Sequence, residues 1–221
     1  MTVAKRLKGG IKPAVFLLAL LPFVSLMYNF ATDNLSANPL DDITDTTGTW
    51  TLRFLLITLA VTPLRKITGW SFIAQLRRMI GLFAFFYVCM HFTTYIWLDK
   101  FFEWDEMVKD VAKRPFITAG FTSFVLMIPL AITSWNRMVK WMGGKRWKML
   151  HRLVYATAVG GVIHYLWLVK ADKQRPLIYG ALLAIVLGYR LWDFLRQRLV
   201  PTRSLVSQDL QVEIIENVGN S

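Results

Sequence analysis

The stretch MIGLFAFFYVCMHFTTYIWL, residues 79–98, decides the fold class of this chain. It contains 20 residues without a single Asp, Glu, Lys or Arg. Twenty helical residues rise about 30 Å, which is the thickness of the hydrocarbon core of a bilayer. Charged residues flank both ends, with Arg77 and Arg78 before the stretch and Asp99 and Lys100 after it. The stretch therefore predicts a transmembrane helix with one histidine, His91, inside it.

Five further apolar stretches have a comparable length, in a chain that is 55% hydrophobic with a mean hydropathy of +0.41. Lipid-exposed backbone must satisfy its hydrogen bonds within each segment, and these runs are too continuously apolar for barrel strands. The prediction is an all-α, polytopic membrane helical bundle. Its six transmembrane helices are expected at residues 14–30, 49–64, 79–98, 116–134, 153–169 and 177–194. The six-helix domain is expected over 14–195, between an N-terminal segment, 1–13, and a C-terminal tail, 196–221.

The distribution of basic residues predicts the orientation of the bundle. With Arg190 counted in the tail, 18 of the 26 Lys and Arg residues fall on the side of the two termini and 7 on the other. Cytoplasmic segments are enriched in Lys and Arg, so both termini are expected to be cytoplasmic. The first span also resembles a signal sequence with a cleavage point near Ala31 or Ala37. Charge counting does not distinguish a cleaved signal sequence from an uncleaved first transmembrane helix.

The net charge of +12 does not predict nucleic-acid binding, because the basic residues are spread over short loops between apolar spans. Cys89 is the only cysteine and lies within a span, so it is interpreted as a packing residue. No Gly-rich nucleotide-binding motif occurs, which predicts that electrons handled by this protein come from another molecule. Within residues 99–116, charged residues alternate with aromatic ones. This pattern predicts a short amphipathic helix at the interface, or a lid over an outer site.

The three histidines of the chain are the candidate cofactor ligands. His91 lies 13 residues after Arg78, and His164 lies 13 residues after His151, so both are expected about 20 Å in from the same side. Neutral imidazole is a common axial ligand of haem iron, and one iron between two helices needs one nitrogen from each. The sequence predicts a haem bridged by His91 and His164 near the outer face.

A second, inner haem at His151 is an open alternative. If His151 and His164 shared one ideal helix, 13 residues would turn it by about 220° and place them on different faces. The third span offers no histidine opposite His151, since Arg77 occupies the matching turn. A guanidinium does not ligate iron but pairs with a haem propionate. Arg53, near the outer end of the second span, is either another propionate partner or a side chain that reaches the interface.

Two rival functions use the same histidines differently. A transporter or channel would use them to relay protons or bind a metal ion, although no repeated halves are visible in the sequence. A membrane anchor for another enzyme would leave them without a chemical role. Electron relay requires that the purified protein contain haem, whereas neither of the two rival functions requires haem.

Four blocks of the sequence resemble one known family. They are WTLRFLLITLAVTPLR (50–65), LRRMIGLFAFFYVCMHFTTYIWLD (76–99), KRPFITAGFTSFVLMIPLAITSWN (113–136) and WKMLHRLVYATAVGGVIHYLWLVK (147–170). They are similar to successive spans of the YedZ/MsrQ family, the haem-binding membrane subunits of the bacterial periplasmic methionine sulfoxide reductase system. The likeness extends more distantly to the membrane domain of ferric reductases and NADPH oxidases.

The resemblance implies several properties that the residues alone do not. It implies a b-type haem protein of the bacterial inner membrane that passes electrons to a periplasmic molybdopterin subunit, which reduces methionine sulfoxide. Quinol is the implied electron source and FMN an implied additional cofactor, while a flavin donor or another acceptor is the alternative. His91, His151 and His164 match the histidine positions of the family. Arg77 stands where the oxidase-like relatives place a histidine.

Overall fold

The computed structural model describes residues 3–199, and this part of the chain is helical without any strand. The elements are α1 (Val3–Ala31), α2 (Pro39–Thr68), η1 (Ser71–Gln75), α3 (Arg77–Thr94), η2 (Tyr95–Asp99), α4 (Trp104–Lys113), α5 (Pro115–Ile132), α6 (Asn136–Met142), α7 (Gly144–Leu150), α8 (Leu153–Leu168) and α9 (Gln174–Leu199). The all-α prediction is confirmed. The predicted tail, 196–221, lies outside the described residues beyond position 199.

Each predicted span lies inside a long helix or matches one to within two residues, with α3 and η2 together forming the third. Four segments are long and apolar enough to cross a membrane, namely Gly10–Ala31, Arg77–Asp99, Pro115–Ile132 and Gln174–Arg198. These segments support the prediction of a membrane protein. The count of six crossings stays a prediction.

Helix α2 begins at Pro39, ten residues before the predicted second span. The Asn, Pro and Gly content of residues 31–50 predicts turns, and that prediction is wrong from Pro39 onward. Proline at the first helical position has its fixed φ already suited to the helix, and its missing N–H costs nothing there. Asp41 and Asp42 lie in the first turn, where negative charge interacts favourably with the helix dipole. The helix ends at Gly69, whose φ of 73° lets its N–H bond to the Arg65 carbonyl oxygen.

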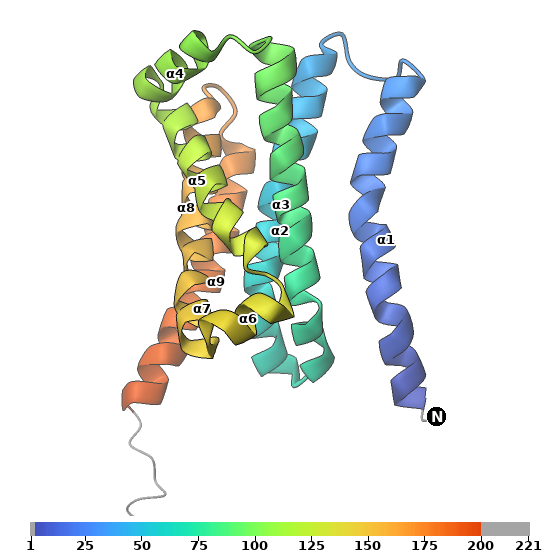
Figure 1. Ribbon diagram of the computed structural model, residues 1–221, viewed down its shortest axis with the longest axis vertical. Helices are drawn as coiled ribbons and strands as arrows, with labels where there is room; N and C mark the ends of the chain where they lie inside the picture. The colour runs from blue at the N-terminus through green and yellow to red at the C-terminus, as the bar shows by residue number, and fades with distance from the viewer. Residues whose placement is uncertain (1–2, 200–221) are drawn as a thin grey trace, which may run out of the picture.

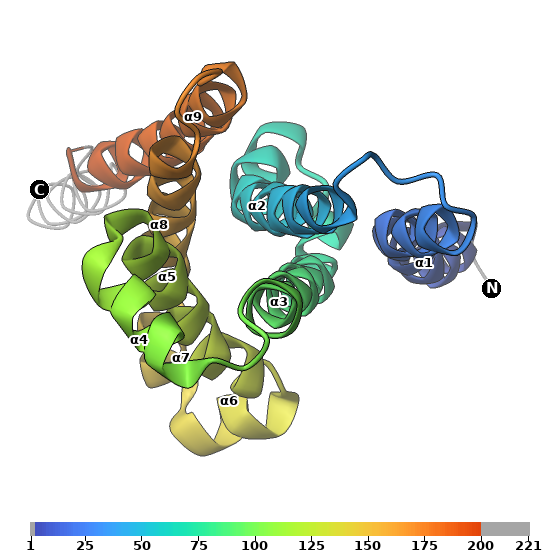
Figure 2. The same ribbon diagram turned by 90° about the horizontal axis from the view of Figure 1, so that it is seen from above.

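The long helices pack as two pairs with α1 and α9 at the outside (Figures 1 and 2). The most extensive contacts join α2 to α3 and α5 to α8. One buried cluster includes Phe54, Phe83 and Tyr87 on α2 and α3. A second includes Leu59 and Ala158, on α2 and α8, and connects the pairs. The histidines of α3 and α8 therefore belong to different pairs.

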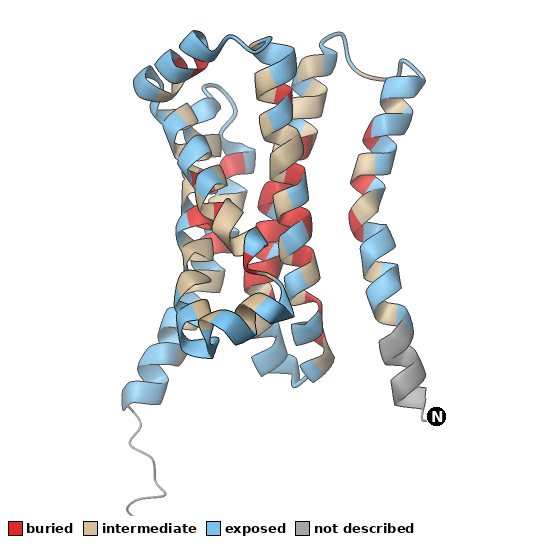
Figure 3. Ribbon diagram, in the orientation of Figure 1, coloured by how far each residue is buried: buried red, intermediate tan, exposed pale blue. Residues whose placement is uncertain are grey.

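The distribution of exposed side chains is typical of a membrane bundle. Buried residues concentrate in the middle of α2 and α3, whereas α9 is largely exposed along its length (Figure 3). Leu17 and Leu18 of α1 are each 63% exposed, and Ile185 of α9 is 68% exposed. Soluble proteins rarely expose apolar surface on this scale, because it is costly in water. Lipid is the environment that fits these faces.

Tyr87 of α3 forms two hydrogen bonds with the backbone of α1. The Tyr87 hydroxyl of α3 accepts a hydrogen bond from the Phe23 N–H at 2.9 Å and donates one to the Ala19 carbonyl oxygen at 3.0 Å. Ala19 and Phe23 are four residues apart, so the hydroxyl inserts into the hydrogen-bond ladder of the helix beside Pro22. Tyr87 is fully buried, and the contact satisfies its polar atom.

The short helix predicted within residues 99–116 is confirmed as α4, which lies at one end of the bundle (Figure 1). Its inner face buries Met107 and Asp110. Asp110 accepts from Lys100 Nζ at 2.9 Å and from Arg114 Nε at 3.2 Å. The hydrogen bond from Lys100 lowers the pKa of the Asp110 carboxyl below its ordinary value. The opposite end of the bundle carries α6 and α7, together with the start of α1 and the end of α9.

Candidate functional site

The structure brings His91 of α3 and His164 of α8 side by side. Their ring centres are 6.2 Å apart and the ring planes are inclined by 81°. Both side chains are half-buried in the bundle. Residues 73 positions apart in the sequence thus meet because the α2–α3 and α5–α8 pairs pack against each other, α2 against α8 and α3 against α5, and bring their histidines together.

Both rings use the same nitrogen to contact a backbone carbonyl. His91 Nδ1 lies 3.1 Å from the Thr44 carbonyl oxygen of α2, and His164 Nδ1 lies 2.6 Å from the Phe116 carbonyl oxygen of α5. A carbonyl oxygen only accepts, so each Nδ1 carries the hydrogen and donates it. In a neutral imidazole this fixes the tautomer and leaves Nε2 with its lone pair, which is the usual arrangement of a metal-binding histidine.

A glycine one helical turn after each acceptor makes both contacts possible. Gly48 follows Thr44 by four residues and Gly120 follows Phe116 by four. A side chain four residues later lies over the preceding turn of the helix, where it would cover this carbonyl. A Cβ on Gly48 would lie 3.0 Å from the His91 ring, and one on Gly120 would lie 2.7 Å from His164 Nδ1. The two glycines expose the carbonyl groups and leave room for the rings.

The separation of the rings fits one metal ion held between them. A ring nitrogen lies about 1 Å from its ring centre and metal–imidazole bonds are about 2 Å, so two imidazoles sharing a metal lie about 6 Å apart. A zinc site needs three or four protein ligands. No group of three or more His, Cys, Asp or Glu side chains gathers anywhere in residues 3–199. Two imidazoles are the complete protein contribution to a porphyrin iron with two axial ligands.

His151 lies outside the helix that carries His164. It occupies the turn between α7 and α8, since α8 begins at Leu153. The Trp147 ring covers it at 4.0 Å between centres, and its Nε2 lies 3.1 Å from Thr133 Oγ1. The Thr133 hydroxyl donates its only hydrogen to the Pro129 carbonyl oxygen, so Nε2 of His151 is the donor and Nδ1 keeps the lone pair. The argument from helical phase therefore does not apply, because it assumed a single helix through both histidines.

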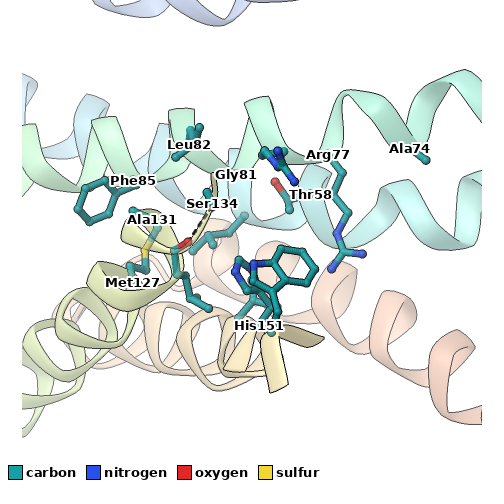
Figure 4. A pocket seen from close by; sticks show the side chains of 15 residues that line it. Thr58, Ala74, Arg77, Gly81, Leu82, Phe85, Met127, Ala131, Ser134 and His151 are labelled. Atoms are coloured by element: carbon teal, nitrogen blue, oxygen red, sulfur yellow. Dashed lines mark hydrogen bonds between the residues drawn. The ribbon is translucent and has the colours of Figure 1, made fainter. Parts of the chain in front are cut away.

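A cavity of about 250 Å³ lies beside His151, between α3 and the segment from α5 to α8. Arg77, Arg78 and Gly81 of α3 line one side, and Met127, Trp147 and His151 line the other. In Figure 4 the Arg77 side chain extends from α3 toward the side on which His151 lies. This volume is slightly below the range of typical ligand pockets, which is roughly 300–1,000 Å³. As the sequence predicts, no second histidine lines this cavity.

Three arginines lie near these sites. Arg53 Nε donates to the Tyr179 hydroxyl at 2.9 Å, and its guanidinium lies 4.6 Å from the Trp50 ring centre, at the contact of α2 with α9. Arg190 of α9 donates to the Tyr155 hydroxyl and to the Leu59 carbonyl oxygen, each at 2.5 Å. The positive charges of Arg77 and Arg190 are close enough to repel each other. Arg77 and Arg78 line the cavity beside His151, so that cavity carries positive charge, which suits an anionic group.

The sequence is similar to a known group of proteins along most of its length. Residues 47–162 match the family model described as ferric reductase like transmembrane component. The heme-binding subunit MsrQ of the protein-methionine-sulfoxide reductase of Herminiimonas arsenicoxydans is 56% identical over 184 residues, which cover 82% of this chain and 84% of the relative. The chain belongs to the MsrQ family. The MsrQ subunits of Ralstonia nicotianae and Azospira oryzae are 53% and 51% identical over 83% and 85% of the chain, and over 85% and 81% of their own lengths.

In this MsrQ family member, the matched region runs from Thr47, beside the His91 ring, to Val162, two residues before His164. It therefore includes His91, His151 and both glycines of the ring contacts. Sequence reasoning identified the histidines but missed Gly48 and Gly120. An isolated glycine in an apolar helix marks close approach of a neighbouring group, and that signal was available for Gly120, whereas Gly48 lies outside the predicted spans.

Proposed function

We propose that this protein is the haem b electron-transfer subunit of a periplasmic methionine sulfoxide reductase system. It accepts electrons from the quinone pool or a flavin donor and delivers them to a periplasmic molybdopterin-containing reductase, which repairs oxidised periplasmic proteins. The single observation that carries this proposal is the pair formed by His91 and His164. The two imidazoles lie 6.2 Å apart and each Nδ1 donates its hydrogen to a backbone carbonyl oxygen, an arrangement that supports axial ligation by Nε2.

Haem held at this pair supplies reversible one-electron chemistry of its iron. The residues of the chain orient and shield that group. The carbonyl groups of Thr44 and Phe116 hold the imidazoles in the tautomer that offers Nε2 to a metal. The surrounding helices exclude water and provide the low dielectric that sets a redox potential.

The arrangement of the ends supports the proposed orientation. We place six crossings in the bacterial inner membrane, with residues 14–195 as the transmembrane domain and residues 1–13 and 196–221 as cytoplasmic segments. The start of α1, the end of α9 and the basic α6 and α7 lie at one end of the bundle (Figure 1). The positive-inside rule assigns this end to the cytoplasm. The pair of histidines then serves the periplasmic half and His151 the cytoplasmic half.

The inner cavity is the proposed point of electron entry. His151 presents Nδ1 as a free acceptor or ligand, and Arg77 provides positive charge for a propionate or another anionic group. A second haem at His151, or contact with the quinol or flavin donor, uses these residues. FMN is included as an additional cofactor on family resemblance. Arg53 is proposed as a propionate partner of the outer haem, in competition with its hydrogen bond to Tyr179.

Visible absorption spectra of purified variants test the outer site. His91→Ala and His164→Ala are each expected to lose most of the haem absorbance per protein, with helical content unchanged by circular dichroism. His151→Ala is expected to keep the outer haem. Full haem content in both of the first two variants contradicts the site. Electron transfer to the purified periplasmic reductase subunit, measured beside ferric iron as acceptor, separates the proposal from a ferric reductase with another acceptor.

A further inference from the structure

The segment that joins α5 to α8 carries a concentrated positive charge. We call residues 136–150, which contain α6, Gly143 and α7, the basic arm. Its five cationic side chains are all exposed, namely Arg137, Lys140, Lys145, Arg146 and Lys148. The sequence contains no Asp or Glu between Asp110 and Asp172. Among the ion pairs of residues 3–199, none involves one of these five.

The basic arm also exposes large aromatic side chains beside its charges. Trp141 is 78% exposed, and Trp135, directly before the arm, is 69% exposed. Helix α6 runs across the axis of the long helices (Figure 1), and seen from above it projects from the bundle (Figure 2). Exposed tryptophan together with Lys and Arg, on a helix that crosses the bundle axis, is the arrangement of a segment at a membrane surface.

We propose that the basic arm binds the headgroups of anionic phospholipids. Its charge is complementary to phosphate, and no carboxylate of the arm opposes that charge. The two tryptophans suit the boundary between headgroups and acyl chains, where a ring has both a polar and an apolar neighbour. An acidic protein is the other partner that the charge allows. The exposed tryptophans beside the charged residues favour lipid.

Lipid bound to the arm acts on the inner cavity, because the arm forms part of its wall. Trp147 of α7 donates its Nε1 hydrogen to the Thr133 carbonyl oxygen at 2.8 Å and covers His151 at 4.0 Å. Lys145 and Lys148 lie within two residues of Trp147. Headgroups that hold these lysines at the membrane surface therefore hold the tryptophan over His151. This binding site does not depend on the identity of the cofactor.

Lipid retention by the full chain tests the proposal. The protein is reconstituted in vesicles of equal parts phosphatidylcholine and phosphatidylglycerol, extracted in mild detergent, and its bound lipids are counted by native mass spectrometry. The test variant carries Lys140→Gln, Lys145→Gln and Lys148→Gln. The matched control carries Lys109→Gln, Lys113→Gln and Lys173→Gln, which remove three exposed lysines near the opposite end.

The wild type and the control are expected to retain phosphatidylglycerol in preference to phosphatidylcholine. Each basic side chain near an anionic surface strengthens binding about fivefold, so the arm variant is expected to lose up to about a hundredfold of the preference. The preference of the wild type is also expected to weaken as salt increases, a measurement that needs no variant. Equal retention of both lipids by the wild type overturns the proposal. The proposal is also overturned if the arm variant and the control variant lose the preference for phosphatidylglycerol to the same extent. It is likewise overturned if the wild type binds polyglutamate through the arm but does not bind phosphatidylglycerol.

Discussion

Replacement of Gly120 by alanine tests how the outer imidazole pair is held. The new Cβ would lie 2.7 Å from His164 Nδ1, whereas ordinary contact begins at 3.4 Å, so the ring must retreat by about 0.7 Å. That movement lengthens its 2.6 Å hydrogen bond to the Phe116 carbonyl oxygen to roughly 3.3 Å, beyond the usual range. Overpacking costs about 1–3 kcal/mol and the lost hydrogen bond about 1 kcal/mol.

A cost of about 2 kcal/mol or more corresponds to a loss of about 30-fold in haem affinity. The measurement is a titration of haem into the apoprotein, followed by visible absorption. Gly188→Ala is the matched control, because a Cβ on Gly188 of α9 meets nothing within 4 Å. The control is expected to bind haem like the wild type. The reasoning is refuted if Gly120→Ala also binds haem with wild-type affinity.

Three further changes test other parts of the structure. Tyr87→Phe removes the hydroxyl inserted into α1 and is expected to lower stability by about 1 kcal/mol in chemical unfolding, with unchanged haem content; a loss of haem instead contradicts the assigned role. The lowered pKa of Asp110 means that its ion pair with Lys100 stabilises α4 above the ordinary carboxyl pKa, and this stabilisation is lost as pH falls through the lowered pKa. Amide hydrogen exchange in α4 is expected to be faster in Asp110→Asn at neutral pH and to converge with the wild type in acid; a constant difference argues against the ion pair. Thr133→Val removes the acceptor for His151 Nε2 and is expected to change the spectrum or potential of any inner cofactor while the outer haem signal stays, and a change at the outer haem alone contradicts this.

The helices and the outer pair of histidines could be predicted because both depend on simple distances. A fixed rise of 1.5 Å per residue places His91 and His164 at one depth when each is counted from the same side. Apolar stretches locate the long helices because the bilayer fixes their length. The start of α2 was missed because the Asn, Pro and Gly content of residues 31–50 was interpreted as a turn signal, although Pro39 and the two aspartates after it also suit the first turn of a helix.

The contacts that hold the rings could not be predicted in the same way. The acceptors are backbone carbonyls of Thr44 and Phe116, and every residue has one, so their use depends on how neighbouring helices pack. The position of His151 outside α8 depends on where α7 ends, and helix ends in a continuous polar and basic segment have weak signals. The contact between the Trp147 and His151 rings depends on that turn, and no sequence pattern predicts it.

The two imidazoles belong to separate helix pairs, and this has a consequence for biogenesis. The α2–α3 hairpin brings His91, and the α5–α8 unit brings His164. The α2–α3 half can insert and associate before the α5–α8 unit has been synthesised, since its strongest contacts are internal. The metal cofactor proposed to be shared by the rings would then join the two halves, so cofactor supply would govern the last step of maturation in the cell.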